Sequence, residues 1–261
     1  MITGAGSGIG RACARSFAGE GAHVVIGDVD GDRAASVAAE LCDMGPTAVG
    51  MACDVAADGE LGALRDLALS RFGQVDVVMN NVGVIAAGQP LNIPVAEWQR
   101  VIDINLLSLV RSNHVFLPLL LEQGSGHVVN TASSVGLYQY SFDHLPYTAT
   151  KAAVVAISEA LALYLRPRGV GITCLCPGPV MTNIAEHTVV HGKMGAVTMP
   201  GLPFLEPSDV SEMVVRAVRE DQFLLLTHPD AMHELLVHKA EDPEAFLAEQ
   251  TAKAAGGDPA T

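Results

Sequence analysis

Short apolar runs alternate with segments of helical period along nearly the whole chain. Six runs are short and apolar enough to be buried strands, and they lie at His23–Gly27, Ala48–Cys53, Val75–Met79, His127–Asn130, Ile172–Cys176 and Phe223–Thr227. Apolar residues recur with helical spacing between them, near residues 9–19, 31–44, 58–72, 94–121, 147–168 and 207–220. Because parallel strands need crossover connections, this alternation predicts a doubly wound parallel sheet with helices on both faces. We expect one α/β domain over residues 1–261 with about seven strands.

The longest stretch without a clear period runs from Gly178 to Pro207 and is rich in glycine and proline. A loop of this length inside a compact domain is usually functional or mobile. We therefore expect a mobile lid at about residues 179–207. The small residues at about 254–261 predict a frayed tail.

Composition and charge narrow the class of protein. The chain has 49% apolar residues, 17% charged residues and a formal net charge of −14. Such an acidic chain is poorly suited to nucleic-acid phosphates or anionic lipid, so we expect neither nucleic acid nor a membrane as partner. The N-terminal residues show no targeting pattern, and no window approaches about 18 uninterrupted apolar residues, so we expect no signal peptide and no membrane span. Five cysteines without a C-x-x-C pair predict reduced core thiols in a cytoplasmic protein.

A glycine-rich segment near the N-terminus predicts a site for phosphate groups. Its glycines are spaced G-x-x-x-G-x-G, at Gly4, Gly8 and Gly10, rather than G-x-G-x-x-G. Glycine lets the backbone turn tightly and approach a pyrophosphate at a helix N-terminus. Taken alone, such a cluster also fits a simple tight turn.

Asp28 makes the interpretation of the glycine segment more specific. It follows the predicted strand His23–Gly27, where a carboxylate would accept hydrogen bonds from the ribose hydroxyls of an adenosine. A 2′-phosphate there would meet like charge, and the next residue, Val29, offers no cation. Asp28 alone also fits a solvated turn, but with the glycines it favours NAD over NADP as the cofactor.

Tyr147 and Lys151 are four residues apart, so on a helix they share one face. A phenol with a pKa near ~10 is a poor proton relay at neutral pH, but a lysine cation nearby favours the phenolate. Tyr147 could then exchange a proton with a substrate hydroxyl while hydride moves to or from a nicotinamide. A Y-x-x-x-K pair also arises by chance in many helices.

Other polar residues follow the predicted strands, and ligands of open α/β sheets bind at these carboxyl ends. They form three short segments, at Asn80–Gly83, Asn130–Ser134 and Pro177–Thr182. A hydroxyl at Ser133 is placed to hydrogen-bond a substrate carbonyl or alcohol.

The ordered set of motifs resembles the short-chain dehydrogenase/reductase family, in its compact single-domain branch, from residue 3 to about residue 227. The matching positions are Thr3–Gly10, Asp54-Val55, Asn80–Gly83, Asn105, Ser133, Tyr147, Lys151 and Pro177–Thr182. The resemblance implies a Rossmann-type fold in which Tyr147 is the acid/base and Lys151 lowers its pKa and contacts the nicotinamide ribose. Ser133 would orient the substrate oxygen, and Asn105 would hold a water that links Lys151 to solvent.

The resemblance also implies the residues that hold the cofactor. Asp54 would bind the adenine amino group, Asn80 and Asn81 the adenosine side, and Thr182 the carboxamide. The whole implied set is Gly4, Ser7, Gly8, Ile9, Gly10, Asp28, Val29, Asp54, Val55, Asn80, Asn81, Gly83, Tyr147, Lys151, Pro177, Gly178, Val180 and Thr182.

Two features depart from the family pattern. Ser133 keeps the family's three-residue step from Asn130, but Ser134 remains an alternative for the hydroxyl that orients the substrate. Only Met1 and Ile2 stand where relatives have several apolar residues before the Thr-Gly. Either the start is misassigned or the central first strand is short.

The remaining apolar and histidine-rich segments predict a substrate wall, an oligomer and no metal. Tyr140, Phe142 and His144 are candidates for the substrate wall, with packing against the lid as the alternative. The helices at 94–121 and 147–168 are more apolar than one sheet requires, and in the family they pair across a two-fold axis, so we expect a homo-oligomer, a tetramer or a dimer. The histidine pairs have no suitably placed carboxylates, so we expect no metal site.

The sequence therefore predicts an NAD-dependent oxidoreductase that interconverts a secondary alcohol and a ketone of moderate size and low polarity. Alternatives on this scaffold are an isomerase, epimerase or dehydratase that uses bound NAD, and a protein that senses the dinucleotide without chemistry. The set of Ser133, Tyr147 and Lys151 favours the oxidoreductase, because a sensor needs no proton relay.

Overall fold

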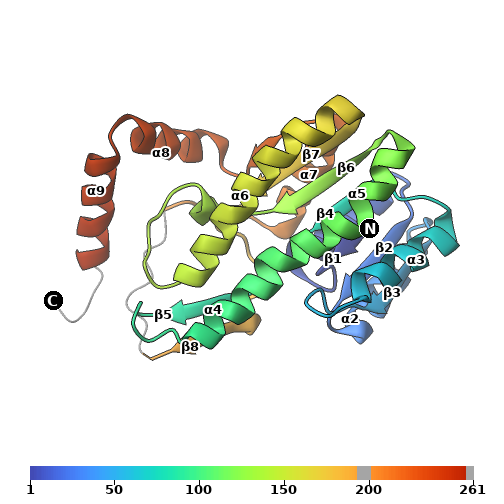
Figure 1. Cartoon of the computed structure of the whole chain (residues 1–261), viewed down its shortest axis with the longest axis horizontal. Coiled ribbons are helices and arrows are strands. Elements are labelled where there is room, and N and C mark those ends of the chain that lie inside the picture. The colour runs from blue at the N-terminus through green and yellow to red at the C-terminus, as the bar shows by residue number, and fades with distance from the viewer. Residues whose placement is uncertain (193–200, 257–261) are drawn as a thin grey trace.

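The computed structural model describes residues 1–192 and 201–256 and is built around a seven-stranded sheet (Figure 1). The strands are β1 (Ile2–Thr3), β2 (Val24–Asp28), β3 (Ala48–Ala52), β4 (Val77–Asn80), β6 (Gly126–Thr131), β7 (Val170–Cys176) and β9 (Leu224–Leu226). All pair in parallel, in the order β3-β2-β1-β4-β6-β7-β9. The order reverses at β1, which confirms the predicted Rossmann-type doubly wound fold.

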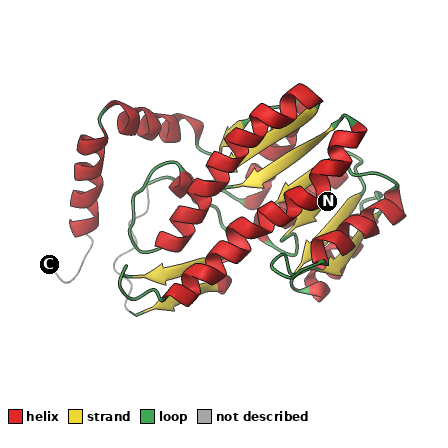
Figure 2. Ribbon diagram, viewed as in Figure 1, coloured by secondary structure: helices red, strands yellow, loops and turns green. Residues whose placement is uncertain are grey.

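Helices cover both faces of this sheet (Figure 2). They are α1 (Gly8–Gly19), α2 (Gly31–Asp43), α3 (Glu60–Phe72), α5 (Ser108–Gln123), α6 (Leu145–Leu165) and α7 (Pro207–Arg219). A further helix, α4 (Val95–Ile102), packs on α6 rather than on this sheet. One core joins the sheet to α1, α2 and α7, and a second joins it to α3, α5 and α6. Successive strand residues serve opposite faces: Val24 and Ile26 lie in the first core and Val25 in the second.

A widened turn at Asp103–Leu107 separates α4 from α5. Here the backbone N–H of Ser108 donates to the carbonyl of Asp103, five residues earlier, which is the pattern of a π-helical turn. The single helix expected at 94–121 is therefore two helices joined by this turn, and Asn105 lies within it, buried.

Two further pairs of elements were not predicted. β5 (Ile85–Gly88) and β8 (Thr188–His191) form a separate two-stranded parallel sheet. After β9 the chain forms α8 (Pro229–Glu241) and α9 (Pro243–Gly256), which extend along one end of the molecule in Figure 1. The start of the expected tail, residues 254–256, thus belongs to a helix, and 257–261 lie outside the described residues.

The expected lid is partly described. It begins with a short 3₁₀ helix, η4 (Asn183–His187), and continues into β8. Residues 201–206 return to the body, where Leu205 bridges Val180. Residues 193–200 of the predicted lid lie outside the described residues.

Two helical segments, Val95–Gln123 and Leu145–Arg168, are long and apolar enough to cross a membrane by length and composition. Only 33% of each apolar window is buried. In the fold both segments pack on the sheet through one side, and side chains such as Leu163, 81% exposed, remain on the other. Each segment therefore has an apolar face beyond the one the sheet covers.

β1 is the shortest strand of the central sheet, with two residues. A groove of about 290 Å³ lies beside it, with Met1, Phe17, His23 and Phe72 among its lining residues. The Met1 amine is buried and donates to the carbonyl oxygen of Val77 at 2.8 Å. Burial lowers the pKa of this amine to about 5, although Asp76 opposes the shift.

Candidate active site

The glycine segment forms the turn between β1 and α1. Gly4 and Gly8 have φ angles of 63° and 53°, in the left-handed region that favours glycine. A Cβ on Gly10 would lie 2.3 Å from the carbonyl oxygen of Gly4, so the close approach of helix to turn requires glycine there. This geometry gives the segment a backbone surface free of side chains.

The N-terminus of α1 is suited to an anion. Ser7 is the N-cap, but its side chain makes no capping hydrogen bond, and the first turn contains no acidic residue. The first N–H groups of the helix, at Gly8, Ile9 and Gly10, thus carry partial positive charge that no side chain neutralises. The turn therefore fits the diphosphate of a dinucleotide.

Asp28 lies beside the same turn. Its carboxylate accepts hydrogen bonds from the backbone N–H of Gly6 at 2.8 Å and of Asp30 at 3.0 Å. A Cβ on Gly6 would come within 2.8 Å of this carboxylate. Val29 is 68% exposed and contributes no charge.

The other residues expected on the adenosine side lie at neighbouring strand ends. Asp54 is exposed and accepts a hydrogen bond from Ala56 N, whereas Val55 is buried. The amide of Asn80 donates to Asn130 at 2.9 Å, and that of Asn81 donates to the Gly4 carbonyl at 3.2 Å. These two amides hold the ends of β4, β6 and the glycine turn together.

Tyr147, Lys151 and Ser133 converge at the carboxyl ends of β6 and β7. The Lys151 Nζ donates to the Thr131 carbonyl at 2.7 Å and lies 5.6 Å from the centre of the Tyr147 ring. The Ser133 side chain hydrogen-bonds Tyr147. Helix α6 thus presents the phenol and the ammonium to the hydroxyl that follows β6.

Burial shifts both titratable groups of this set. It raises the pKa of Tyr147 to about 12, while the hydrogen bond from Ser133 opposes the shift. It lowers the pKa of Lys151 to about 8. At neutral pH the site therefore holds a neutral phenol, ready to donate a proton, beside a lysine that is mostly charged.

Asn105 reaches this set from the π-helical turn. Its Oδ1 accepts from Val84 N at 2.8 Å, and its Nδ2 donates to the Val84 carbonyl at 2.9 Å and to Thr150 at 3.3 Å. A Cβ on the neighbouring Gly83 would lie 3.3 Å from Lys151 Nζ and 4.0 Å from Asn105 Oδ1. Asn105 thus holds the backbone at Val84, next to Gly83, which faces Lys151.

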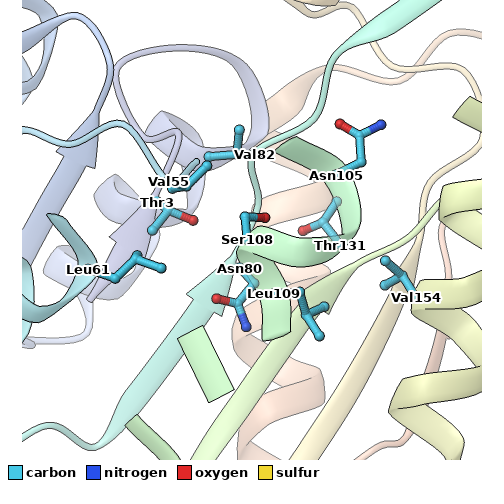
Figure 3. Close-up of a pocket in the computed structure, with 10 residues that line it drawn as sticks. All are labelled: Thr3, Val55, Leu61, Asn80, Val82, Asn105, Ser108, Leu109, Thr131 and Val154. Carbon is cyan, nitrogen blue, oxygen red and sulfur yellow. The ribbon is translucent and has the colours of Figure 1, made fainter. Parts of the chain in front are cut away.

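A small cavity of about 10 Å³ lies behind Asn105, which is space for about one water. Figure 3 shows its lining side chains, which include Thr3, Asn80, Asn105, Ser108 and Thr131. These polar side chains come from β1, β4, the π-helical turn, α5 and β6, and apolar side chains such as Leu61 and Leu109 complete the lining.

Aromatic rings form a row that ends on Tyr147. The ring centres of Tyr138 and Tyr140 are 6.2 Å apart, those of Tyr140 and His144 6.3 Å, and those of His144 and Tyr147 6.0 Å. The Ser134 hydroxyl acts to lower the pKa values of Tyr138 and Tyr140, whereas the Ser133 hydroxyl acts to lower that of Tyr147. Phe142 is 41% exposed and stands outside the row. Ser133 and Ser134 therefore serve different phenols.

The segment after β7 connects this site to the lid residues. Gly178, which follows Pro177, donates its N–H to Thr227 Oγ1 at 2.9 Å. Val180 pairs with Leu205, and Thr182 is the residue before η4, without a side-chain capping hydrogen bond. A Cβ on Gly8 would lie 3.3 Å from Thr182 Cβ, so the lid begins directly on the glycine turn.

Sequence reasoning missed Lys239 on α8. Its Nζ donates to the Leu137 carbonyl at 2.7 Å and to Gln139 Oε1 at 3.4 Å, and so holds the segment that carries Tyr138 and Tyr140. Phe246 of α9 packs in the same apolar cluster as Tyr138. A single lysine about 100 residues away in sequence carried no local signal of this contact.

Comparison with known proteins identifies the family. The family model described as "short chain dehydrogenase" matches residues 1–191, so the chain belongs to the short chain dehydrogenase family. Several relatives are named as oxidoreductases or dehydrogenases. A solved structure described as a short chain dehydrogenase/reductase from Burkholderia phymatum in complex with NAD is 33% identical, with a TM-score of 0.83 over 94% of this chain and 93% of that chain.

Three relatives illustrate the range of the family. The probable oxidoreductase EphD of Mycobacterium tuberculosis is 34% identical over 88% of this chain, but this chain spans only 41% of its length. The 1-deoxy-11-beta-hydroxypentalenate dehydrogenase of Streptomyces exfoliatus is 35% identical over 88% of this chain and 83% of that protein. The 7alpha-hydroxysteroid dehydrogenase of Escherichia coli is 31% identical over 72% of this chain and 73% of that protein.

Proposed function

We propose that this protein oxidises a secondary alcohol, or reduces the corresponding ketone, with NAD as the hydride carrier. The observation that carries the proposal is the convergence of the Ser133 hydroxyl, the Tyr147 phenol and the Lys151 ammonium beside the uncapped N-terminus of α1. When bound, the nicotinamide ring accepts or gives the hydride. Asp28 would bind the adenosine ribose, the first turn of α1 the diphosphate, and Thr182 the carboxamide.

The residues of this chain would handle the proton. In ketone reduction, Ser133 hydrogen-bonds the substrate oxygen, and Tyr147 donates its proton to that oxygen as hydride reaches the carbon. Lys151 stabilises the phenolate that results, by charge. In alcohol oxidation the same proton moves from the substrate hydroxyl to the Tyr147 phenolate.

The substrate we propose is of moderate size and low polarity. The ring row from Tyr138 to Tyr147 offers flat apolar surface next to the reacting hydroxyls. Two relatives are named for hydroxypentalenate and hydroxysteroid substrates, which fits a cyclic secondary alcohol here.

All five cysteines are free, which supports a cytoplasmic location.

The test is a panel of cyclic and linear secondary alcohols, hydroxysteroids included, with purified protein and NAD, read at the NADH absorbance band. The matching ketones with NADH test the reverse direction. We expect turnover with at least one cyclic member and none with the Tyr147→Phe variant. Conversion of a substrate without net change in NADH would instead identify an isomerase, epimerase or dehydratase. NADH binding without any conversion would identify a sensor.

A further inference from the structure

Arg33 stands beside the carboxylate that we assign to the adenosine ribose. A Cβ on Gly6 would lie 2.8 Å from the Asp28 carboxylate and 2.9 Å from Arg33 Cβ, so both side chains border the same point of the glycine turn. An arginine near the adenosine ribose is a group that can accommodate the 2′-phosphate of NADP in dinucleotide folds. The chain thus places a phosphate-binding side chain next to a carboxylate that repels phosphate.

The guanidinium of Arg33 is engaged by two other carboxylates. Its Nε lies 3.3 Å from Asp30 Oδ2, and its NH1 and NH2 donate to Glu186 Oε2, each at 3.3 Å. Glu186 belongs to η4, more than 150 residues away in the chain. The pair therefore connects α2, at the adenosine end, to the first helix of the lid.

Glu186 is itself held in place for this contact. Asn183 Nδ2 donates to Glu186 Oε1 at 2.6 Å, which leaves Oε2 for Arg33. The hydrogen bonds from Asn183 and Arg33 lower the pKa of Glu186, so its charge persists through neutral pH. Thr182, the residue before η4, lies against Gly8, and Arg33 lies against Gly6, so both partners of the ion pair come from segments that adjoin the glycine turn.

We propose that Glu186 is a specificity-determining residue for the cofactor: it occupies Arg33 and adds negative charge near the adenosine end, and thereby disfavours a 2′-phosphate. The inference rests on the proposed dinucleotide site. Asp28 alone repels a 2′-phosphate, but Arg33 could offset that repulsion if its guanidinium were free. Glu186 removes this offset, so Asp28 and Glu186, two carboxylates from distant parts of the chain, both favour NAD over NADP.

The test measures dissociation constants for NADH and NADPH by nicotinamide fluorescence, in wild-type protein and in Glu186→Gln. We expect the ratio of the NADPH constant to the NADH constant to fall by about three- to tenfold, because an exposed ion pair is of modest strength but a like charge is removed as well. The same change in an Asp28→Ala background should lower the ratio further. The fall in this ratio should be smaller in high salt, since the Arg33 side chain is 41% exposed and its charge is screened.

Two controls separate this effect from a general loss of charge or of structure. Glu20→Gln breaks the exposed ion pair with Arg219 at the other end of α1 and should leave the ratio unchanged. Adding Arg33→Met to Glu186→Gln should return the ratio of the NADPH constant to the NADH constant to its wild-type value or above. An unchanged ratio in Glu186→Gln, or equal weakening of both dinucleotides, would overturn the inference. Failure of wild-type protein to bind either dinucleotide would instead overturn the proposed function.

Discussion

Burial acts in opposite directions on the two proton-carrying side chains of the site. The phenol of Tyr147 is kept neutral by a pKa of about 12, and the ammonium of Lys151 is made a better proton donor by a pKa of about 8. Both shifts have the same cause, which is that the charged form of each group loses hydration. A ligand that brings positive charge or hydrogen-bond donors to the phenolic oxygen would bring the two pKa values closer together.

The residue that should matter most for chemistry is Tyr147. We expect Tyr147→Phe to abolish turnover and to change NADH affinity by less than about tenfold, because the phenol acts in the transition state rather than in cofactor binding. Stopped assays with the substrate found in the alcohol panel, together with a fluorescence titration of NADH, measure both quantities. Tyr164→Phe, on the exposed part of the same helix, is the matched control. A Tyr147→Phe variant with more than about a tenth of the wild-type rate would show that another group carries the proton.

A second prediction concerns Asp28 and the choice between the two dinucleotides. We expect wild-type protein to favour NADH over NADPH by roughly two orders of magnitude in kcat/KM, since a 2′-phosphate would face the carboxylate. Asp28→Ala combined with Val29→Arg should narrow or invert that preference by adding a forked cation. Side-by-side kinetics with both dinucleotides measure it, and equal efficiencies in wild type would place Asp28 away from the ribose.

His127 predicts how stability depends on pH. Its ring is buried and hydrogen-bonded to Thr173 at 2.8 Å, and burial lowers its pKa to about 4. The unfolded chain binds a proton below about pH 6.5 and the folded chain only below about pH 4. Stability should therefore fall as pH drops through this window, by up to about 3 kcal/mol from this group.

The measurement is urea unfolding between pH 7 and pH 4 for wild type, His127→Gln and the control His114→Gln. His127→Gln should flatten the pH dependence, because the amide can keep a hydrogen bond to Thr173 and does not titrate. A slope as steep as that of wild type in this variant would assign the acid sensitivity to other groups, such as the Met1 amine.

Among the elements, the sequence predicted those whose apolar pattern is set by the main sheet. The six predicted strands and six helical segments all have counterparts within a few residues, because one or two faces of each are buried in the main cores. β5 and β8 were missed because they are short and pair with each other across about 100 residues of chain. α8 was missed because Met232 is the one residue of this helix that is fully buried. A single buried position gives no apolar period from which a helix could be predicted.

The candidate site was predicted to a similar extent. The side chains that the motifs singled out do converge, because parallel strands bring their carboxyl ends to one edge of the sheet. The contacts that hold them could not be predicted, since they involve backbone carbonyls such as that of Thr131 or side chains without a motif, such as Lys239. The sequence also could not decide whether Ser133 or Ser134 acts on Tyr147, because that depends on which phenol each hydroxyl faces.

The short β1 leads to a prediction about an added segment. Five apolar residues placed before Met1 should extend the strand between β2 and β4, fill part of the groove and replace the buried amine by an amide. Burial of that apolar area should raise the melting temperature by several degrees. Scanning calorimetry checks this against a control that carries five Gly and Ser residues. Equal melting temperatures for both extensions would show that the groove contributes nothing.

For the whole molecule, the apolar faces left by α5 and α6 predict self-association. Leu163 and Tyr164 are 81% and 46% exposed on α6, although both are large apolar side chains. A matching face on a second copy would cover them around a two-fold axis, which would make a dimer or tetramer. The charge of −14 opposes non-specific association, so an oligomer should be of defined size.

Light scattering after size exclusion measures the mass. We expect wild type to be at least dimeric and Leu163→Asp to shift the population to smaller species. Met44→Lys, an exposed methionine after α2 on the other side of the sheet, is the control and should leave the mass unchanged. A monomeric wild type at micromolar concentration would contradict the assembly.

The π-helical turn at Asp103–Leu107 makes the site sensitive to the number of residues as well as to their identity. The turn accommodates one residue more than a regular helical turn, and this surplus lets α4 and α5 keep their own packing while Asn105 faces Val84. Deleting Leu106 would remove no polar group of the site, and α4 and α5 could join as one regular helix with both still packed as before. The widened turn would be lost, however, and Asn105 would lose the position from which it makes both bonds to Val84. In this stretch of the chain, a change in length should therefore be less tolerated than most changes of side chain.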